Sequence, residues 1–419
     1  MWLVPTRINK LKVKTMFNKK SIKPYGMLVL PLLTVIGMFL AFPATCLRAA
    51  QPDNQAQVGD SNELKAVMDR CMTVKTNSVL ASQVHKMKSF LIMDYCAALG
   101  NGNLMVTLAG VPENLNIYLG KTDFWRDRPN KKAFQSGNVL PGFLNLRIPS
   151  MAGAGFSQVV DMFHAEARTT LTKGADRVEI RSVTPHEADN YVINDITNKS
   201  THALQVQVDT VTEARSGFET AAGTNGYGMA WVTRKTLVPE PHHEYGNREF
   251  RMWAAIGTCV LGASAEIVTN GLESATATFT IPANQTVRLI TKVHSTGIPI
   301  TMTPDDPLPD TMLALKEMTY KKSDALIADH RDWWGRYWLK GYVKLDAEPV
   351  LERAWYGGLY VFGCANKVGS YPAGCNGWPV NDTPPWGGDY HWNYNQQAAY
   401  YCAFSISCLL YTSPSPRDS

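Results

Sequence analysis

Two asparagines stand among aromatic residues near the end of the sequence, in the stretch PPWGGDYHWNYNQQAAYY, residues 384–401. One residue separates Asn393 from Asn395, and in an extended backbone residues at this spacing point to the same face. Two neighbouring carboxamides can hold one water molecule or one hydroxyl-rich ligand between them. The spacing therefore predicts a site built around Asn393 and Asn395.

The residues around this pair have the chemistry that sugar binding needs. Trp378 and Trp386 supply flat apolar faces, on which the axial C–H groups of a sugar can stack. Asp389, Tyr390 and His391 supply directional hydrogen bonds for hydroxyl groups. The alternative is structural: the tryptophans pack in the core while the amides cap turns, and the sequence leaves this interpretation open.

The segment Gly374–Asn395 resembles the start of the catalytic helical domain of glycoside hydrolase family 95, the inverting α-L-fucosidases and α-L-galactosidases. The segment Leu99–Trp125 is similar to the opening sandwich motif of that family, a Gly-Asn-Gly turn followed by an acidic and aromatic stretch that ends in Trp. The chain departs from the family after the asparagine pair, where QQAAYY replaces an acidic residue and a third Asn. The resemblance thus implies a divergent six-hairpin glycosidase. The positions that match the catalytic motif are Trp378, Asn381, Asp382, Pro384, Pro385, Trp386, Gly387, Tyr390, Asn393 and Asn395.

The resemblance also implies a mechanism, because the matching asparagines of the family position the attacking water. An amide is too weak a base to act alone, so inversion also needs a carboxylate base and a carboxylic acid, held ~6.5–9.5 Å apart. Asp382 and Asp389 are the nearest carboxylates, but turn capping or ligand binding is the ordinary role of either. The acid and base of the family come from later helices, and only residues 341–407 remain for them. We therefore expect this chain to be truncated and catalytically inactive.

Strand signals dominate the middle of the chain. Apolar and polar residues alternate in short segments such as 114–121, 176–183 and 286–295, and Gly, Pro, Asn and Asp separate them. Many short strands without intervening helices predict an antiparallel β-sandwich, which we place at residues 59–301.

Helical spacing replaces this pattern after the proline-rich residues 302–310. Apolar residues over 311–340 can form one side of a helix, so residues 302–340 are predicted to be a linker with helices. A second helix is predicted at Pro349–Ala365, with Pro349 in its first turn. Residues 341–407 are then expected to begin an (α/α)6 toroid, giving a multidomain β + α protein. The side chains expected on the apolar side of the linker are Leu313, Leu315, Met318, Leu326, Trp333, Trp334 and Trp338.

The two ends of the chain carry other signals. Residues 1–50 hold eight basic residues and no acidic ones, and the apolar run 27–42 is followed by small residues. This order is typical of a secretory signal peptide, here with an upstream extension, and predicts a secreted or periplasmic protein. A membrane anchor formed by residues 27–42 is the alternative, although the run is shorter than the ~20 residues of a spanning helix. Residues 408–418 match a translated sequencing adapter, so we expect residues 408–419 to be an artefact, the native sequence to end near Ser407 and the gene to continue.

Composition excludes several other classes of protein. The formal net charge is +5, but residues 51–419 carry 33 basic against 36 acidic residues, which argues against nucleic-acid binding. No CxxC spacing or other metal-ligand pattern is present, so no metal and no cofactor are expected, and the thiols are expected to be buried and free. The expected partner is an oligosaccharide or polysaccharide, with no stable protein partner. A non-catalytic carbohydrate-binding sandwich is the alternative function, and a polysaccharide lyase is disfavoured because lyases generally place the toroid before the β-domain.

Overall fold

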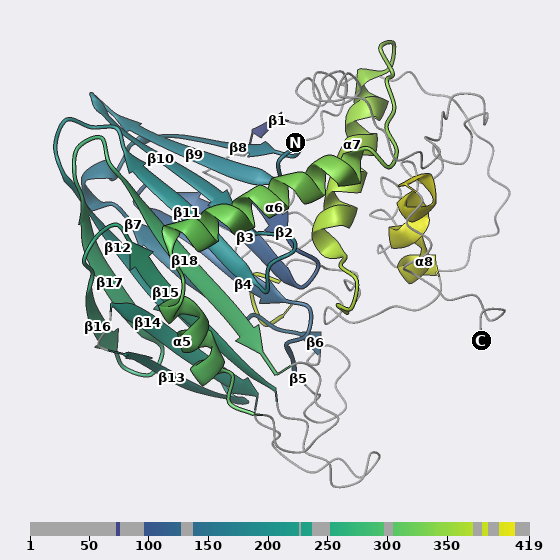
Figure 1. Ribbon diagram of the computed structural model, residues 1–419. Helices are drawn as coiled ribbons and strands as arrows, with labels where there is room; N and C mark the ends of the chain where they lie inside the picture. Colours follow the sequence, from purple (N-terminus) through teal and green to yellow (C-terminus); the bar gives the residue numbers. More distant parts are fainter. Residues whose placement is uncertain are drawn as a thin grey trace, which may run out of the picture.

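The described part of the chain forms two facing antiparallel sheets followed by helices (Figure 1). The predicted antiparallel β-sandwich is therefore confirmed, whereas the (α/α)6 toroid remains a prediction. The signal peptide, the apolar run 27–42 and residues 408–419 lie outside the described residues. The computed structural model describes residues 73–75, 96–126, 137–225, 228–236, 252–296, 305–371, 379–383 and 394–406.

The larger sheet has nine strands in the order β1-β8-β9-β10-β11-β18-β15-β14-β13, and all neighbours are antiparallel. The chain leaves this sheet after β11, returns at its edge with β13, β14 and β15, and adds β18 last, between β11 and β15. Its strands are β1 Thr73–Lys75, β8 Gly155–Asp161, β9 Glu166–Lys173, β10 Asp176–Val183, β11 Tyr191–Asn198, β13 Phe218–Thr224, β14 Met229–Thr236, β15 Trp253–Leu261 and β18 Thr286–Ser295.

The smaller sheet has seven antiparallel strands in the order β16-β17-β12-β7-β4-β3-β2. A separate pair, β5 with β6, lies at one end of the sandwich (Figure 1). The strands of the smaller sheet are β2 Ala97–Gly100, β3 Leu104–Val111, β4 Asn114–Lys121, β7 Gly142–Arg147, β12 Leu204–Val211, β16 Glu266–Asn270 and β17 Ser274–Ile281, and the short pair is β5 Trp125–Arg126 with β6 Gly137–Asn138.

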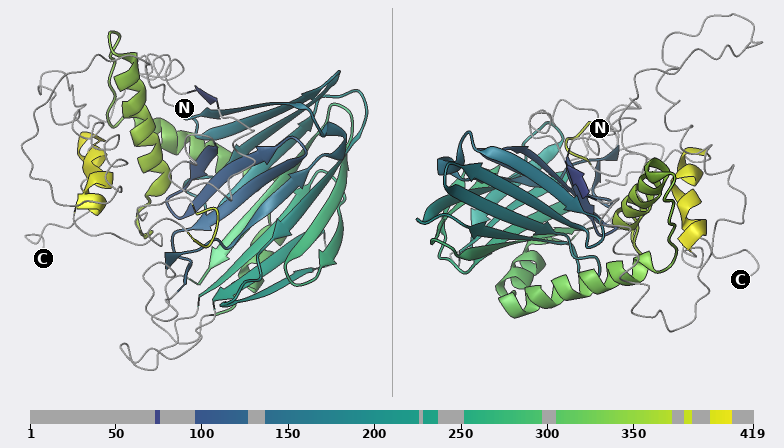
Figure 2. Two further views of the ribbon diagram at one scale, coloured as in Figure 1. Left: turned by 180° about the vertical axis from the view of Figure 1, so that it is seen from behind. Right: turned by 90° about the horizontal axis from the view of Figure 1, so that it is seen from above.

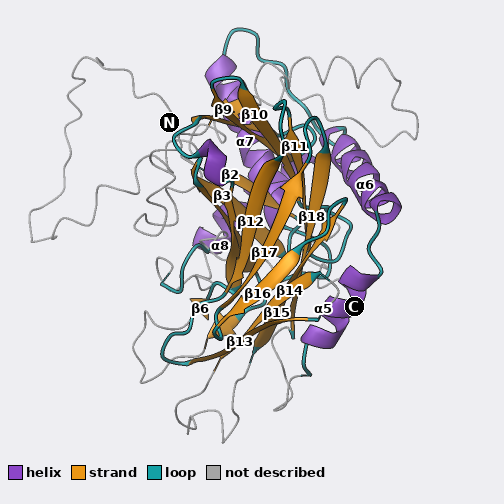
Figure 3. Ribbon diagram, turned by 90° about the vertical axis from the view of Figure 1, so that its left-hand side faces the viewer, coloured by secondary structure: helices purple, strands orange, loops and turns teal. Residues whose placement is uncertain are grey.

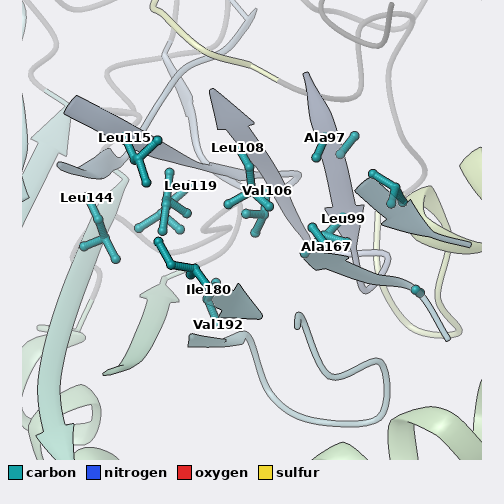
Figure 4. Close-up of a cluster of buried hydrophobic side chains, with 14 of the residues drawn as sticks. Ala97, Leu99, Val106, Leu108, Leu115, Leu119, Leu144, Ala167, Ile180 and Val192 are labelled. Atoms are coloured by element: carbon teal, nitrogen blue, oxygen red, sulfur yellow. The ribbon is translucent and has the colours of Figure 1, made fainter. Parts of the chain in front are cut away.

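Alternation explains how the core forms between the sheets. In β12 the side chains of Leu204, Val206 and Val208 are buried, while Gln205 is exposed and Gln207 is half-buried. Figure 4 shows aliphatic side chains of β2, β3, β4 and β7 directed toward those of β9, β10 and β11. The inner apolar faces of the two sheets thus pack against each other and form one buried core layer. The labelled core residues are Ala97, Leu99, Val106, Leu108, Leu115, Leu119, Leu144, Ala167, Ile180 and Val192.

Central strand β15 does not alternate, because both of its faces are covered. Its residues from Ala254 to Cys259 are all buried, and helix α5 (Leu308–Lys316) packs on its outer face. A Cβ atom added at Gly257 would lie 2.6 Å from Leu315 Cδ1, so glycine permits the close approach of the helix. This is why the alternation that marks β12 and β10 is missing from β15.

The predicted linker consists of two helices that lie against the outer face of the nine-stranded sheet (Figures 2 and 3). Helix α5 ends at Lys316, and α6 (Tyr320–Trp338) begins after Thr319, whose side chain accepts a hydrogen bond from Lys322 N at 3.2 Å. Leu315 and Met318 are buried as predicted, but the prediction for Leu313 is wrong, since its side chain is 54% exposed. A sheet covers only one side of a helix that packs on it, so residues on the far side of α5 stay exposed.

The predicted helix Pro349–Ala365 is confirmed residue for residue as α7. It packs against α6 through aromatic rings, with Trp334 and Tyr360 centroids 5.5 Å apart and Trp338 and Tyr356 centroids 6.1 Å apart. Trp334 and Trp338 are both fully buried. The remaining helices are α8 Tyr394–Tyr400 and two 3-10 turns, Pro149–Met151 and Tyr401–Ile406.

The described cysteines and helices bear on two smaller expectations, the state of the thiols and the presence of a membrane span. Cys96, Cys259 and Cys364 are buried free thiols, as expected, and the thiol of Cys402, which is half-buried, lies 3.8 Å from the carbonyl of Ala399. Burial raises the pKa of Cys96 to about 12, so this thiol stays protonated at neutral pH. No helix within these ranges is both long and apolar enough to cross a membrane.

Candidate functional site

The structure describes one of the seven residues predicted for the site. Asn395 is the second residue of α8 and is exposed, so its backbone is helical and not extended. The expectation of an extended backbone is therefore wrong at Asn395. The shared face of Asn393 and Asn395 stays a prediction, because Asn393 lies outside the described residues. The other predicted site residues, Trp378, Trp386, Asp389, Tyr390, His391 and Asn393, lie outside the described residues.

The described segment Pro379–Thr383, which precedes the Pro-Pro-Trp motif, is fixed on the sandwich, and we call it the anchored segment. Pro379 lies over Gly120 at the end of β4, where an added Cβ atom would come within 2.6 Å of its ring. Val380 is buried in a cluster with Tyr118 and Leu140. Thus the segment covers the outer face of β3 and β4 at one end of the smaller sheet.

Asp382 is the main anchor. Its two carboxylate oxygens accept bonds of 2.7 Å each from Nη1 and Nη2 of Arg234 on β14. The same carboxylate accepts a 3.3 Å bond from Leu140 N, and Arg126 Nη2 donates to the Asp382 carbonyl at 3.2 Å. The side chains of Asp382 and Arg234 are each only 2% exposed. A two-pronged charged bond in a dry environment fixes both position and orientation.

Positive charge surrounds this carboxylate. Arg215 Nε lies 3.7 Å from Asp382 Oδ2. The guanidinium groups of Arg234 and Arg126 lie over the ring of Phe218, at 3.6 Å and 5.4 Å from its centroid. Burial lowers the pKa of Arg126; Asp382 opposes this shift, while Arg234 and Arg215 add to it. With Arg234 on both of its oxygens, Asp382 cannot act as a general base, and its role is to position the segment.

The Gly-Asn-Gly turn between β2 and β3 is the joint between the sandwich and α7. Gly102 N donates to the carbonyl of Cys364 at 2.8 Å, and a Cβ atom at Gly100 would clash with that same carbonyl. Gly102 has φ +81°, a conformation that glycine adopts without strain, and a Cβ there would collide with Lys367. The turn is therefore a hairpin, as predicted, but its glycines are required by the helix that docks on it.

Asn101 completes this joint from inside. It is fully buried, and its Nδ2 donates to the carbonyls of Pro185 and Ala188 at 3.4 and 3.3 Å. Its Oδ1 accepts from Leu104 N at 2.7 Å. Lys367, after α7, donates to the same Ala188 carbonyl at 3.3 Å. The loop between β10 and β11 is thus held by the turn and by the end of α7 together.

The acidic and aromatic residues of the opening motif are also held in place. Asp123 accepts a 2.7 Å bond from Ser295 Oγ and lies 3.2 Å from Lys121 Nζ, with its side chain 11% exposed. Trp125 Nε1 donates to the carbonyl of Thr122 at 2.6 Å. The opening motif and the anchored segment therefore lie at the same end of the sandwich, since Lys121 directly follows Gly120, over which Pro379 lies.

Sequence reasoning did not find Arg234, Arg126 or Phe218. Arg234 lies 148 residues from Asp382, and nothing near either residue indicates the pairing. One signal was available: Arg234 occupies a buried position in the strand MAWVTRKT, and a buried arginine requires a charged or hydrogen-bonding partner.

The described residues contain no group of three His, Cys, Asp or Glu side chains able to hold a metal ion. The arrangement that these residues do form is a rigid platform. It consists of the end of β4, the carboxylate of Asp123, which is held by Ser295 and Lys121, and the anchored segment.

No protein-family model matches this chain, and no curated protein matches it. Among solved structures it is similar to a protein from the human microbiome named as a kojibiose phosphorylase, with TM-score 0.49 and 10% identity, over 70% of this chain and 41% of that one. Two structures of a GH92 α-mannosidase from Bacteroides thetaiotaomicron, one of them with mannoimidazole, have TM-score 0.24 and 10% identity, over 66% of this chain and 40% and 39% of theirs. The chain thus spans less than half the length of these solved proteins, which are named for activities on glycosides, and the likeness identifies no family for it.

Proposed function

We propose that this chain is part of an exported glycoside-processing enzyme, an inverting hydrolase of terminal α-L-fucosyl or related bonds. In this proposal Asn393 and Asn395 hold the attacking water, and Trp378 and Trp386 stack on the sugar. The partner is an oligosaccharide or polysaccharide, and the reaction uses no cofactor. Export through the N-terminal signal peptide belongs to the same proposal, with anchoring by residues 27–42 as the alternative.

The observation that supports the proposal is the Asp382–Arg234 pair. It fixes the chain 11 residues before Asn393, on the same end of the sandwich that carries Asp123 and Trp125. Water-positioning residues must be held within a fraction of an ångström of their productive geometry, and rigid elements achieve this better than free loops. A sandwich that buries an ion pair to fix one short segment fits that requirement.

The hydrolysis itself needs an acid and a base in addition to the two amides. Asp382 is the one carboxylate of the anchored segment, and it is committed to Arg234. The amides therefore orient the water, and other carboxyl groups move the protons.

The test is a release assay on α-L-fucosyl and α-L-galactosyl oligosaccharides, run with this chain and with the product of the complete gene. Product anomers are followed by proton NMR from the first minutes, because an inverting enzyme releases the opposite anomer first. Release of the retained anomer, or no release from any α-linked substrate by the complete product, would reject the proposal.

A second candidate is non-catalytic glycan binding by the sandwich, and one row of side chains favours it. Asn116, Asn145, Asp209 and Thr276 are directly paired across four neighbouring strands of the smaller sheet. They share hydrogen bonds, with Asn145 Nδ2 donating to Asn116 Oδ1 at 2.8 Å and Thr276 Oγ1 to Asp209 Oδ1 at 2.7 Å. Glycan binding that is lost in Asn145→Ala but kept in Asn395→Ala would favour this candidate over hydrolysis.

A further inference from the structure

A pair of buried histidines joins α6 to the sandwich, outside the site described above. His330 lies in the middle of α6 and is 1% exposed, and His186 lies in the loop between β10 and β11 and is 2% exposed. The ring of His330 bridges two separate segments of the larger sheet. Its Nδ1 accepts a 3.1 Å bond from His186 N, and its Nε2 lies 2.8 Å from the carbonyl of His164, between β8 and β9.

These two contacts define the protonation state of His330. A carbonyl oxygen can only accept, so Nε2 carries the hydrogen, and a backbone N–H can only donate, so Nδ1 offers its lone pair. This is one tautomer of the neutral ring. A proton added at Nδ1 would face the His186 N–H, and two donors cannot bond to each other. Protonation therefore breaks the tie between α6 and the β10–β11 loop and leaves a buried amide without an acceptor.

His186 extends the contact through its ring. It stacks on Trp333 of α6 with centroids 3.4 Å apart and planes at 14°, and Trp333 stacks in turn on Tyr337 at 5.0 Å. His186 Nδ1 lies 3.1 Å from Glu187 Oε1, on a side chain that is 52% exposed. The joint therefore consists of a bridging ring and a ring stack side by side.

The charged groups around the pair come from five parts of the chain. Glu187 lies beside His186, and Lys367, after α7, donates to the His186 carbonyl at 2.8 Å. On α6, Arg331 pairs with Glu166 of β9 at 2.6 Å. In the β8–β9 turn the ring of His164 pairs with Asp161 at 2.7 Å, on a half-buried surface.

Burial dominates these influences for both rings. It lowers the pKa of His330 to about 4; the carbonyls of His164 and Ala165 oppose this shift, and His186 and Arg331 add to it. Burial also lowers the pKa of His186 to about 4, with Glu187 opposing and Lys367 adding to the shift. An accessible histidine titrates near 6.5, so between about pH 6.5 and about pH 4 the detached state binds more protons than the docked state. Docking is complete above this window and weakens as the pH falls through it.

We propose that His330 and His186 form an acid-sensitive joint, which holds α6 against the sandwich at neutral pH and releases it in acid. Because α6 leads into α7, and Phe362 of α7 packs against Tyr400 of α8 with ring centroids 5.7 Å apart, release also loosens the support of α8, the helix that carries Asn395. The inference does not depend on the proposed hydrolysis, since it concerns the docking of a helix that any function of this chain would retain.

The test is hydrogen exchange of the whole chain, measured by mass spectrometry from about pH 7 to about pH 4 and corrected for the intrinsic effect of pH on exchange. Peptides from residues 320–338 report on α6, and peptides from β15 and β18 report on the sandwich. Opening of α6 is expected to rise about tenfold for each pH unit and each histidine within the window, while the strands stay protected. Simultaneous loss of protection in α6 and in the strands would contradict the proposal.

His330→Gln is the decisive variant, because a glutamine side chain keeps one donor and one acceptor but does not titrate. It is expected to remove the His330 share of the pH dependence, about tenfold per pH unit. His202→Gln is the matched control, since His202 is 55% exposed in its side chain and should leave the dependence unchanged. An unchanged slope in His330→Gln would overturn the proposal.

A direct titration keeps the inference testable even where the variant does not fold. In the wild-type chain with labelled histidine, the ring signal of His330 is expected to stay neutral down to about pH 4 and to change together with the loss of α6 protection. Titration near 6.5 without loss of protection would also overturn the proposal.

Discussion

Arg234 and Asp382 are 148 residues apart in the chain and face each other through two 2.7 Å bonds, each side chain 2% exposed. This pair connects β14 to the segment that leads into the aromatic motif. A buried pair of this kind contributes more to specificity of position than to net stability, because desolvation offsets much of the attraction. Removing only one of the two charges is nonetheless strongly destabilising, because the other charge stays buried without a partner.

Asp382→Asn is expected to destabilise the chain by about 3–5 kcal/mol, because the buried Arg234 loses its counter-charge. Urea unfolding of the purified chain, followed by tryptophan fluorescence, measures the change. Asp332→Asn is the control, since Asp332 pairs with Arg336 on the surface of α6 with its side chain 65% exposed, and we expect less than about 1 kcal/mol there. Equal effects in the two variants would show that the anchor has no special role.

Gly102→Ala is expected to destabilise the joint between the sandwich and α7. Gly102 combines φ +81° with a clash between an added Cβ atom and Lys367. Gly153 has a similar φ, +73°, but open space around it, so Gly153→Ala isolates the backbone strain of about 1–2 kcal/mol. Thermal unfolding should therefore show a larger loss in Gly102→Ala than in Gly153→Ala. An equal loss of thermal stability in the two variants would mean that the packing of α7 against the turn adds nothing to the backbone strain.

Asn101→Asp keeps the shape of a fully buried side chain but replaces its donor by a charged acceptor. In the wild-type chain the amide of Asn101 donates to the carbonyls of Pro185 and Ala188. In the variant both carbonyls would face a carboxylate oxygen, which cannot donate. We expect a loss of about 3 kcal/mol or more at pH 7, partly recovered in mild acid as the new carboxyl is protonated. Denaturant unfolding at two pH values checks both parts. Asn114→Asp, on an exposed residue of β4, should show neither effect.

Asn395→Ala tests the proposed water-positioning role in the product of the complete gene. Loss of a positioning amide is expected to lower kcat by about 100-fold with little change in KM, because the water is held most strongly in the transition state. Gln397→Ala is the matched control, as Gln397 is an exposed neighbour on the same helix. Steady-state kinetics on an α-L-fucosyl substrate gives both parameters. An unchanged kcat in Asn395→Ala would remove this amide from the mechanism.

The sequence predicted those elements whose burial follows a simple period. Strand β10 and helix α7 have the predicted bounds, because one buried face leaves a period of two or of about 3.6 in the residues. Strand β15 was not recognised, because the sheet covers one of its faces and α5 the other, which erases the alternation. Leu313 was assigned to a buried face by the same periodicity, but it is exposed, because the sheet covers only one side of α5.

The sequence alone determined the sandwich, the helices after it and the residue types of the aromatic motif, since local preference and hydrophobic alternation are written into neighbouring residues. Only the tertiary structure decided that Asp382 meets Arg234, that Gly102 supports α7 and that Asn395 belongs to a helix. Such contacts join residues far apart in the chain. They depend on the register and packing of whole elements, which no short stretch of residues specifies.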